Sequence, residues 1–558
     1  MLATLLLLTT LLPTRPGDGV DLLADCTPNS TQAETAIVVN PADPNHIVVA
    51  CMDWSGTAQV IKHSVTFDGG ASWSCGRLRL DSGFMVQGDP ELLFDVNGDV
   101  HLVYLAALGP GGNSIRVRRS LDGGLTWRRA TVISTDTSDD KPKVATCRAA
   151  VAHHGRIVVT WMKADTSSQS DRIVAAFSDD FGTSWSAPVL VNDVDASGGR
   201  EGGGSDLAFA SDGDLFLCWQ DESPRELWCD RSTDGGATFA TDLLVTSYAN
   251  TPNPLPGFAF DLKPVFAMAV DASGGPHDGN VYFAWHTWNS SGAIAHADVM
   301  LAMSGDDGQT WTTILANPGD SAPTDQFMPD VDVDPWGGVN LIWHDRRADP
   351  GGSTLQLWGG RSLDGGATMA TELAIADAPF DPSSDAFGGA FIGHYNALAS
   401  HPRGAVACWA DNRAGADSED LFVDPWNSGL TPSAPTISAA TGGRVDLAIT
   451  PGPNLAGATY LALATLSGTV PPLIVDGIAI DLVWDELTTV CWLCPNGGPM
   501  FNGAGVLGGD GSATAALDSL GPFDPAFAGE VVHVVAVFFD ATGDVVHATV
   551  PERIELVP

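Results

Sequence analysis

The sequence is poor in basic residues. It carries 26 lysines and arginines against 68 aspartates and glutamates, which gives a net charge of −42 over 558 residues. A field of that sign repels phosphate backbones, so the composition argues against nucleic acid as a partner. Solubility in a salty or crowded exterior explains this charge better than an acidic binding surface does.

Long hydrophobic runs are also scarce. The run Leu2–Leu12 is too short to span a bilayer and suits a signal-peptide core, although it lacks a basic flank and an A-x-A cleavage site. No other segment is long and apolar enough to be a membrane anchor. We therefore expect a signal peptide over residues 1–19, no membrane span, and a secreted or cell-surface location.

Helix-period patterns are almost absent, whereas glycine (62) and proline (36) are plentiful. This combination is typical of many short strands joined by turns, and it predicts an all-β fold.

The nine cysteines are compatible with an oxidising compartment. Cys218 and Cys229 flank a predicted hairpin, and a disulfide across it is one option. Cys491 and Cys494 form a lone C-x-x-C, for which a local disulfide or free thiols fit better than zinc.

A short string recurs six times, with a hydroxyl residue, an aspartate, a glycine turn and usually a terminal aromatic residue. In such a turn the carboxylate accepts hydrogen bonds from nearby amides, and glycine supplies the positive φ. Six equivalent copies favour a structural role over a catalytic one. The strings are TFDGGASW (66–73), SLDGGLTW (120–127), SDDFGTSW (178–185), STDGGATF (232–239), SGDDGQTW (304–311) and SLDGGATM (362–369), and their aspartates are Asp68, Asp122, Asp180, Asp234, Asp306 and Asp364.

Between these strings lies a second repeat of two apolar strands joined by a turn, as in DPELLFDVNGDVHLVYLA (89–106). One unit is thus a four-stranded antiparallel sheet that cannot bury both faces alone, and radial stacking as a β-propeller solves that problem. The last unit lacks the string, and residues 20–26 are candidates for its missing outer strand. We predict seven blades over residues 20–430, with six as the alternative, and a C-terminal β-sandwich over residues 431–558.

The recurring S-x-D-x-G-x-x-W string is similar to the Asp-box, or BNR repeat, of the sialidase superfamily. Over about residues 30–428 the chain resembles secreted bacterial sialidase-like propeller proteins. That resemblance implies that the strings lie on the face opposite the active site. It also implies that functional residues come from the starts of the first strands and from the loops at the other end of the sheets.

The resemblance further implies a standard site with three substrate-clamping arginines, a tyrosine nucleophile backed by a glutamate, and an aspartic acid as acid/base. The strand ETAIVVNP (34–41) lacks the arginine that the family carries there. We therefore expect no standard arginine triad. The preferred interpretation of the strand-end arginines is that they brace adjacent blades, through pairs of Asp345 with Arg346 or of Asp411 with Arg413. The candidate catalytic residues are Tyr395, Arg346, Arg413, Asp89 and Glu34.

His286 and His344 share one register on two blades, and with Asp345 they are weak metal-ligand candidates. Exposed strand-end histidines are the preferred interpretation. The acidic turn DVNGD (95–99) resembles a calcium loop only loosely, so calcium is an alternative to the expectation of no cofactor.

Three functions remain open. The first is a glycan-binding or glycan-processing propeller whose partner is a carbohydrate or glycoprotein. The second is an active exo-acting glycoside hydrolase of sialidase type that uses Tyr395. The third is a non-catalytic cell-surface scaffold. The sequence leaves open whether the chain is an enzyme, which ligand it binds and which oligomeric state it adopts.

Overall fold

The computed structural model describes residues 21–558 apart from short gaps. The gaps are at 27–30, 57, 109–111, 137, 166–169, 194–195, 198–203, 223–224, 293, 321–322, 370, 385–386, 414–417, 427–428, 435, 477, 523 and 550. The predicted signal peptide lies outside the described residues. In the part of the chain that is described, no helix is long and apolar enough to cross a membrane.

Among the described residues, seven antiparallel sheets follow one another from Leu22 to Trp426. We number them sheets 1 to 7. Sheet 1 is β2 (Gln32–Asn40), β3 (Asp43–Asp53), β4 (Val60–Thr66) and β5 (Ser74–Arg77); sheet 2 is β6 (Val86–Phe94), β7 (Val100–Ala107), β8 (Asn113–Ser120) and β9 (Thr131–Val132). Sheet 3 is β10 (Asp139–Thr146), β11 (Ile157–Asp165), β12 (Ser170–Ser178) and β13 (Val189–Leu190), with β14 (Ala196–Ser197) also paired to β12.

The remaining four sheets repeat this order. Sheet 4 is β15 (Ser205–Phe209), β16 (Leu215–Asp221), β17 (Glu226–Ser232) and β18 (Leu243–Ser247); sheet 5 is β19 (Phe266–Val270), β20 (Val281–Asn289), β21 (His296–Ser304) and β22 (Thr312–Leu315). Sheet 6 is β23 (Gln326–Val333), β24 (Val339–Asp345), β25 (Gln356–Ser362) and β26 (Thr371–Ala374); sheet 7 is β27 (Ala397–His401), β28 (Gly404–Asp411), β29 (Asp420–Trp426) and β1 (Leu22–Leu23).

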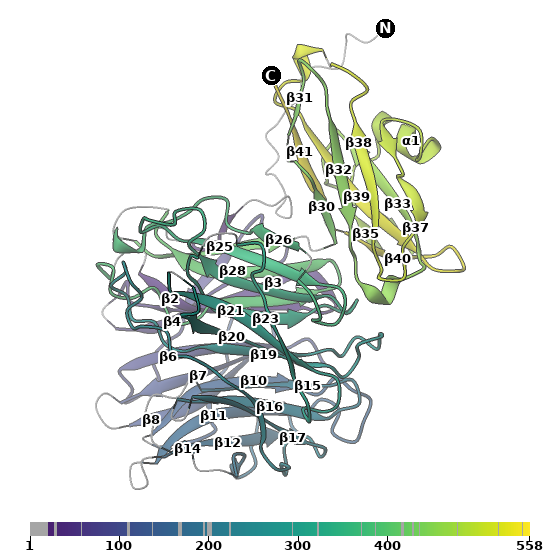
Figure 1. Cartoon of the computed structure of the whole chain (residues 1–558). Helices are drawn as coiled ribbons and strands as arrows, with labels where there is room; N and C mark the ends of the chain where they lie inside the picture. Colours follow the sequence, from purple (N-terminus) through teal and green to yellow (C-terminus); the bar gives the residue numbers. More distant parts are fainter. Residues whose placement is uncertain are drawn as a thin grey trace.

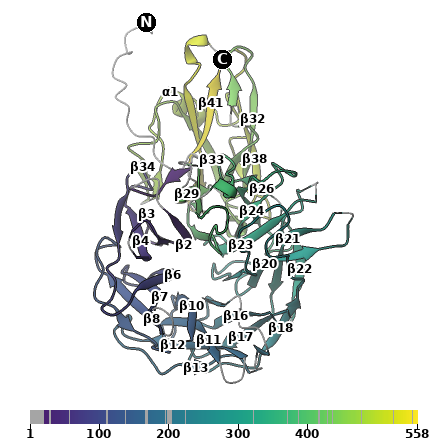
Figure 2. The ribbon, with the colours of Figure 1, turned by 90° about the vertical axis from the view of Figure 1, so that its left-hand side faces the viewer.

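The sheets form a closed ring. The first strand of each sheet contacts the first strand of the next, and β27 of sheet 7 contacts β2 of sheet 1. These first strands lie nearest the centre of the ring in Figure 2, and the outer strands lie at its rim. Each sheet buries both faces against its neighbours, so hydrophobic clusters recur between successive sheets. This arrangement is a β-propeller, and the all-β prediction is confirmed.

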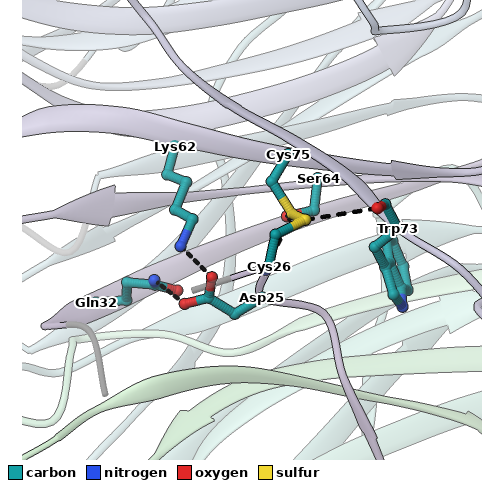
Figure 3. Close-up of a disulfide and its surroundings, with 7 residues drawn as sticks. All are labelled: Asp25, Cys26, Gln32, Lys62, Ser64, Trp73 and Cys75. Carbon is teal, nitrogen blue, oxygen red and sulfur yellow. Dashed lines mark hydrogen bonds and ion pairs between the residues drawn. A yellow bond between two sulfur atoms is a disulfide. The ribbon is translucent and has the colours of Figure 1, made fainter. Parts of the chain in front are cut away.

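The two ends of the ring are joined by the N-terminal segment. Leu22 and Leu23 pair with β29, so the chain start supplies the outer strand of sheet 7, as the sequence predicts. Cys26 then forms a disulfide with Cys75 at the edge of sheet 1 (Figure 3). Beside it, the ammonium of Lys62 pairs with the buried Asp25. One short segment thus ties sheet 7 to sheet 1.

The six recurring turns close in the same way. In each turn the aspartate accepts hydrogen bonds from the hydroxyl two residues earlier and from the backbone N–H four residues later. In the second copy, Asp122 accepts from Ser120 at 2.7 Å and from the Thr126 N–H at 2.8 Å. Partial burial acts to raise the pKa of Asp122, but these hydrogen bonds lower it below its ordinary value. We call the face of the ring that carries these turns the lower face, and the opposite one the upper face.

Residues 430–557 form two further sheets that share one hydrophobic cluster. The first is β30 (Leu430–Pro432), β32 (Arg444–Ile449), β38 (Ala513–Asp518) and β36 (Met500–Phe501). The second is β31 (Thr436–Ser438), β41 (Glu552–Val557), β39 (Val531–Phe539), β33 (Thr459–Thr465), β37 (Ala504–Val506) and β40 (Val545–Ala548). The hairpin β34 (Leu473–Val475) and β35 (Ile478–Ile480), the helix α1 (Glu486–Leu493) and the 3-10 turns Pro382–Ser384, Pro453–Leu455 and Pro525–Phe527 complete the described elements.

This C-terminal region contacts the lower face of the ring (Figure 1). Its contacts fall on the turns between the first and second strands of sheets 5, 6 and 7, for example where Asn454 donates to the carbonyls of Ser273 and Pro335. These contacts place the C-terminal region on the face opposite the upper one.

Candidate functional site

Bulges interrupt four of the first strands near their upper ends. At each bulge one residue other than glycine adopts a left-handed conformation: Glu34 (φ 57°), Asp89 (φ 46°), Lys141 (φ 48°) and Met328 (φ 53°). Such residues are uncommon, and each costs roughly 1–3 kcal/mol. Bulges of this kind re-aim side chains and concentrate near functional sites. Three of these four are charged and belong to the consecutive sheets 1, 2 and 3.

The three charged bulge residues line one half-open cavity of about 430 Å³ on the upper face. That volume lies within the range of small-molecule sites. Apolar side chains such as Met52 and Leu105 form part of its wall. The ionisable groups that line it are Glu34, Asp89, Asp140, Lys141, Lys263 and His394.

Its three carboxyl groups are coupled. Asp89 is within hydrogen-bonding reach of both Glu34 and Asp140. Burial, followed by the charge of Glu34, raises the pKa of Asp89 to about 7. Burial and the charge of Asp89 likewise raise the pKa of Asp140 to about 7. Like charges this close cannot both ionise easily, so Asp89 and Asp140 share a proton near neutral pH.

Tyr395 lies beside this cluster, just before β27. Its hydroxyl donates to Oδ1 of Asp89 at 3.4 Å. Burial raises the pKa of this hydroxyl well above its ordinary value, and the charges of Glu34 and Asp89 add to that effect. The Lys143 ammonium lies 5.6 Å from the centre of the tyrosine ring and is paired with Glu91 at 2.6 Å. Tyr395 is therefore a neutral hydrogen-bond donor in the free protein.

His394 links the cluster to an aromatic rim. Its Nδ1 lies 2.8 Å from Oε1 of Glu34, and its ring centre lies 4.9 Å from that of Phe391. Phe391 packs edge-on against Phe387 at 5.2 Å and against Trp54 at 6.0 Å. All three aromatic rings are partly exposed. The cavity thus combines proton-sharing carboxyls with an aromatic edge.

The predicted arginines lie elsewhere. Arg346 pairs with Asp325 at 3.1 Å and donates to the carbonyl of Gly352. Arg413 pairs with Asp411 at 2.6 Å and with Asp21. Neither lines the cavity that Glu34 and Asp89 border.

In place of the expected pair of Asp345 with Arg346, Asp345 pairs with the next residue, and this contact stays within sheet 6 and does not link neighbouring sheets. Arg347 pairs with Asp345 at 2.8 Å and with Glu372 at 2.8 Å. Its position fits because the backbone N–H of Arg347 also donates to Asp345, which turns the guanidinium back toward β24.

The expectation of exposed strand-end histidines is wrong. His286 and His344 are 3% and 1% exposed, because the long loops of the upper face pack over the strand ends. Burial lowers the pKa of both imidazoles to about 4. Among the described residues no three His, Cys, Asp or Glu side chains are grouped to hold a metal ion. In the turn at 95–99, Asp95 accepts from the N–H groups of Asn97 and Asp99 and pairs with His101.

Sequence reasoning missed Asp140, Lys141 and Lys263. The first two belong to DDKPK (139–143), which occupies the same place in sheet 3 as Asp89 does in sheet 2. In the register of the first strands Lys141 corresponds to Asp89, and Asp140 precedes it by one residue, so aligning the strand starts leads to both. Lys141 points into the cavity only because of its left-handed backbone, for which a lysine gives no signal.

No protein-family model and no curated protein matches the chain. Solved structures similar to it include a protein of unknown function from Dyadobacter fermentans, with 16% identity over 61% of this chain and 97% of that one and a TM-score of 0.40. The Hadza microbial sialidase Hz136 has 15% identity over 67% and 75%, with a TM-score of 0.37. A Penicillium chrysogenum α-L-arabinanase has 16% identity over 62% and 95%, with a TM-score of 0.39. Likeness at this level transfers no activity.

Proposed function

We propose that this chain is a secreted glycan-processing protein that works at the upper-face cavity. The observation that carries the proposal is the contact of the Tyr395 hydroxyl with Asp89, inside a carboxyl cluster that retains a proton near pH 7. Cleavage of a glycosidic bond needs an acid that still holds its proton at the working pH and a second group that acts on the sugar. The resemblance of the six recurring strings to those of sialidase-like proteins supports the same class of substrate.

In this proposal the protonated member of the Asp89–Asp140 pair protonates the leaving oxygen. An ionised carboxylate or Tyr395 then stabilises the sugar or activates water. Transfer of the tyrosine proton to Asp89 accompanies any attack by Tyr395, because the hydroxyl is neutral in the free protein. Phe391 and Trp54 provide an apolar edge on which a sugar ring stacks.

The proposal also includes the number of blades, the C-terminal domain, the signal peptide and the nature of the six recurring turns. We take sheets 1 to 7 as seven blades over residues 20–430, and the two sheets of residues 431–558 as an accessory β-sandwich. Residues 1–19 are proposed to be a signal peptide. The six recurring turns are proposed to be Asp-boxes, which orient the lower face and leave the reaction to the upper one.

The test is hydrolysis of a panel of 4-methylumbelliferyl glycosides and natural polysaccharides by the full chain. Asp89→Asn should reduce kcat by about 10²–10⁴-fold on any substrate that is turned over, because it removes the proton donor. The substitution suits the backbone, since asparagine tolerates a positive φ. Asp230→Asn is the matched control: that carboxyl is buried with a pKa near 7 but lies outside the cavity. Turnover that survives Asp89→Asn contradicts the proposal.

Glycan binding without turnover is the second candidate function, and the rim of Trp54, Phe387 and Phe391 favours it. In that case a glycan array gives signals that Trp54→Ala abolishes, while no substrate in the panel is cleaved. A chain that neither binds nor cleaves any glycan is instead a scaffold, and both glycan proposals fail.

A further inference from the structure

Two buried arginines hold the C-terminal region on the lower face. Arg361 of β25 is 3% exposed; it pairs with Asp334 at 2.5 Å and donates to the carbonyls of Thr450 and Pro451 in the C-terminal region. Arg403, in the turn between β27 and β28, pairs with Asp481 just after β35. The interface thus already carries two guanidinium groups, each matched by a carboxylate.

Aromatic and backbone contacts complete this interface. The ring of Trp336, in the lower turn of sheet 6, lies 4.9 Å from the ring of His547 on β40. The backbone N–H of Asn454 donates to the carbonyl of Trp336 at 3.1 Å. That hydrogen bond crosses from the C-terminal region to the ring, so it breaks whenever the two separate.

Two histidines are buried in the same interface without a carboxylate of their own among the contacts described. His547 is 4% exposed and lies between Trp336 and Phe538, with its ring stacked on the phenylalanine at 5.2 Å and 14°. His401 is 6% exposed, and its Nδ1 accepts the backbone N–H of Arg403 at 3.2 Å. That hydrogen bond requires an unprotonated Nδ1.

Arg403 and Arg361 are the charged groups that act on His547, and Arg403 acts on His401. Asp334 pairs with Arg361 and Asp481 pairs with Arg403. Protonation of either imidazole therefore adds a positive charge beside an arginine, and at His401 it also removes the acceptor for Arg403. Burial, followed by the charge of Arg403, lowers the pKa of both histidines to about 3.

We propose that this interface is an acid-sensitive clasp, in which His401 and His547 stay neutral while the C-terminal region is docked and take up protons when it is released. The region is fixed to the propeller at neutral pH and leaves it in mildly acidic surroundings. The proposal does not depend on the reaction at the upper face.

The expected size follows from proton linkage. A histidine exposed by release regains a pKa of about 6.5, so at pH 5 each one favours the released state by about 30-fold relative to pH 8. Two independent histidines together shift the docking equilibrium by about 1000-fold.

Hydrogen exchange of the Asn454 amide in the full chain measures this opening, even where the released state is rare. After correction for the intrinsic exchange rate, its protection factor should fall about 1000-fold from pH 8 to pH 5. The fall should shrink to about 30-fold in His547→Phe, which preserves the aromatic stack, and also in His401→Asn, which preserves an acceptor. It should vanish in the double variant.

The control is His286→Leu, which removes a buried histidine of sheet 5 far from the interface and should leave the fall unchanged. Amides of β20 in the same sample report unfolding of the ring. Equal protection of Asn454 at both pH values overturns the proposal, and so does loss of protection that β20 shares. If His547→Phe fails to dock at pH 8, the test is the comparison of His401→Asn with the unaltered chain. The proposal is overturned if the protection factor of Asn454 still falls about 1000-fold from pH 8 to pH 5 in His401→Asn.

Discussion

The hydroxyl of Tyr395 lies 3.4 Å from a carboxylate oxygen of Asp89, although 306 positions separate the two residues in the chain. They meet because sheets 7 and 2 both flank sheet 1, whose bulge residue Glu34 borders the same cavity. Neither group has its ordinary pKa there. The pKa of Asp89 is raised to about 7, and the pKa of Tyr395 is raised well above the ordinary value of a tyrosine. This contact yields a direct expectation for the pH dependence of the reaction.

Activity that needs protonated Asp89 should decline above about pH 7. Replacing Glu34 by glutamine removes a negative charge that raises this pKa, so the alkaline limb of kcat/KM should move to lower pH by about one unit. Measured pH profiles of the two proteins on one fluorogenic substrate test this. If the alkaline limb of kcat/KM lies at the same pH in both proteins, a group other than Asp89 is responsible for it.

The same carboxyl should weaken the fold at high pH. Its folded pKa lies above the unfolded value of about 4, so the cost is absent below pH 4, grows between pH 4 and 7, and is complete above pH 7. Asp89→Asn should raise stability by about 1–2 kcal/mol at pH 8 and by nothing at pH 4, after a discount for partial exposure. Thermal melts at the two pH values measure it, and equal effects at both would exclude the linkage.

His286 should weaken the fold in acid. Its folded pKa of about 4 lies below the unfolded value of about 6.5, so stability is full above pH 6.5 and is lost as the pH falls toward 4. Both ring nitrogens lie in the core without a hydrogen-bond partner in the described structure. His286→Leu should therefore recover about 2–3 kcal/mol at pH 4. Urea melts of both proteins at pH 4 and pH 7 give the comparison. A gain in stability of the same size at pH 7 would indicate that repacking, and not protonation, is the cause.

Gly123, in the second recurring turn, should resist substitution for two separable reasons. Its φ is 74°, and an added Cβ would lie 2.7 Å from Cε1 of His46 in sheet 1. Gly98 has φ 83° with nothing within 4 Å, so Gly98→Ala reports the backbone cost alone. Gly123→Ala should cost that amount, about 1 kcal/mol, and about 1–3 kcal/mol more for the contact. Equal losses in denaturant melts would mean that His46 moves aside freely.

The disulfide should matter more than its exposed position suggests. Cys26–Cys75 closes a loop with a sequence separation of 49 and holds the segment that carries β1 (Figure 3). Replacing both cysteines by serine should cost about 2–4 kcal/mol. Cys494→Ser is the control, since that thiol is free and exposed. Thermal melts of the three proteins, with and without reductant, measure the difference, and a reductant effect in the serine variant would point to another disulfide.

Much of the ring could be predicted from the sequence because the turns and strands that form it recur along the chain. Six similar turns, and paired apolar strands between them, specify the sheets and even the N-terminal outer strand of sheet 7. Tyr395, Glu34 and Asp89 are found because they precede or begin first strands. The direction of the Lys141 side chain depends on one positive φ, and the pattern of apolar residues does not indicate where such a φ occurs.

The partners of the arginines depend on loops and on chain ends. Arg413 meets Asp21, which precedes it by 392 residues and comes from the segment that joins sheets 7 and 1. No pattern within either segment foretells that pairing. The burial of His401 and His547 could not be predicted for the same reason. Their neighbours come from two regions of the chain, and no repeated pattern in the sequence indicates that these regions dock.

The pairing of β1 with β29 sets an order of events during synthesis. Leu22 and Leu23 leave the ribosome before the strands of sheets 1 to 6, but their partner strand ends at Trp426. At about 5–20 residues per second, the ring stays open for roughly 20–80 s after its first strand exists. Cys75 follows Cys26 within a few seconds on the same scale, so the disulfide can hold the waiting strand beside sheet 1 until the last sheet arrives. The two-residue strand β1 thus lacks its partner for most of translation, and the early cross-link shortens the search that finally pairs it with β29.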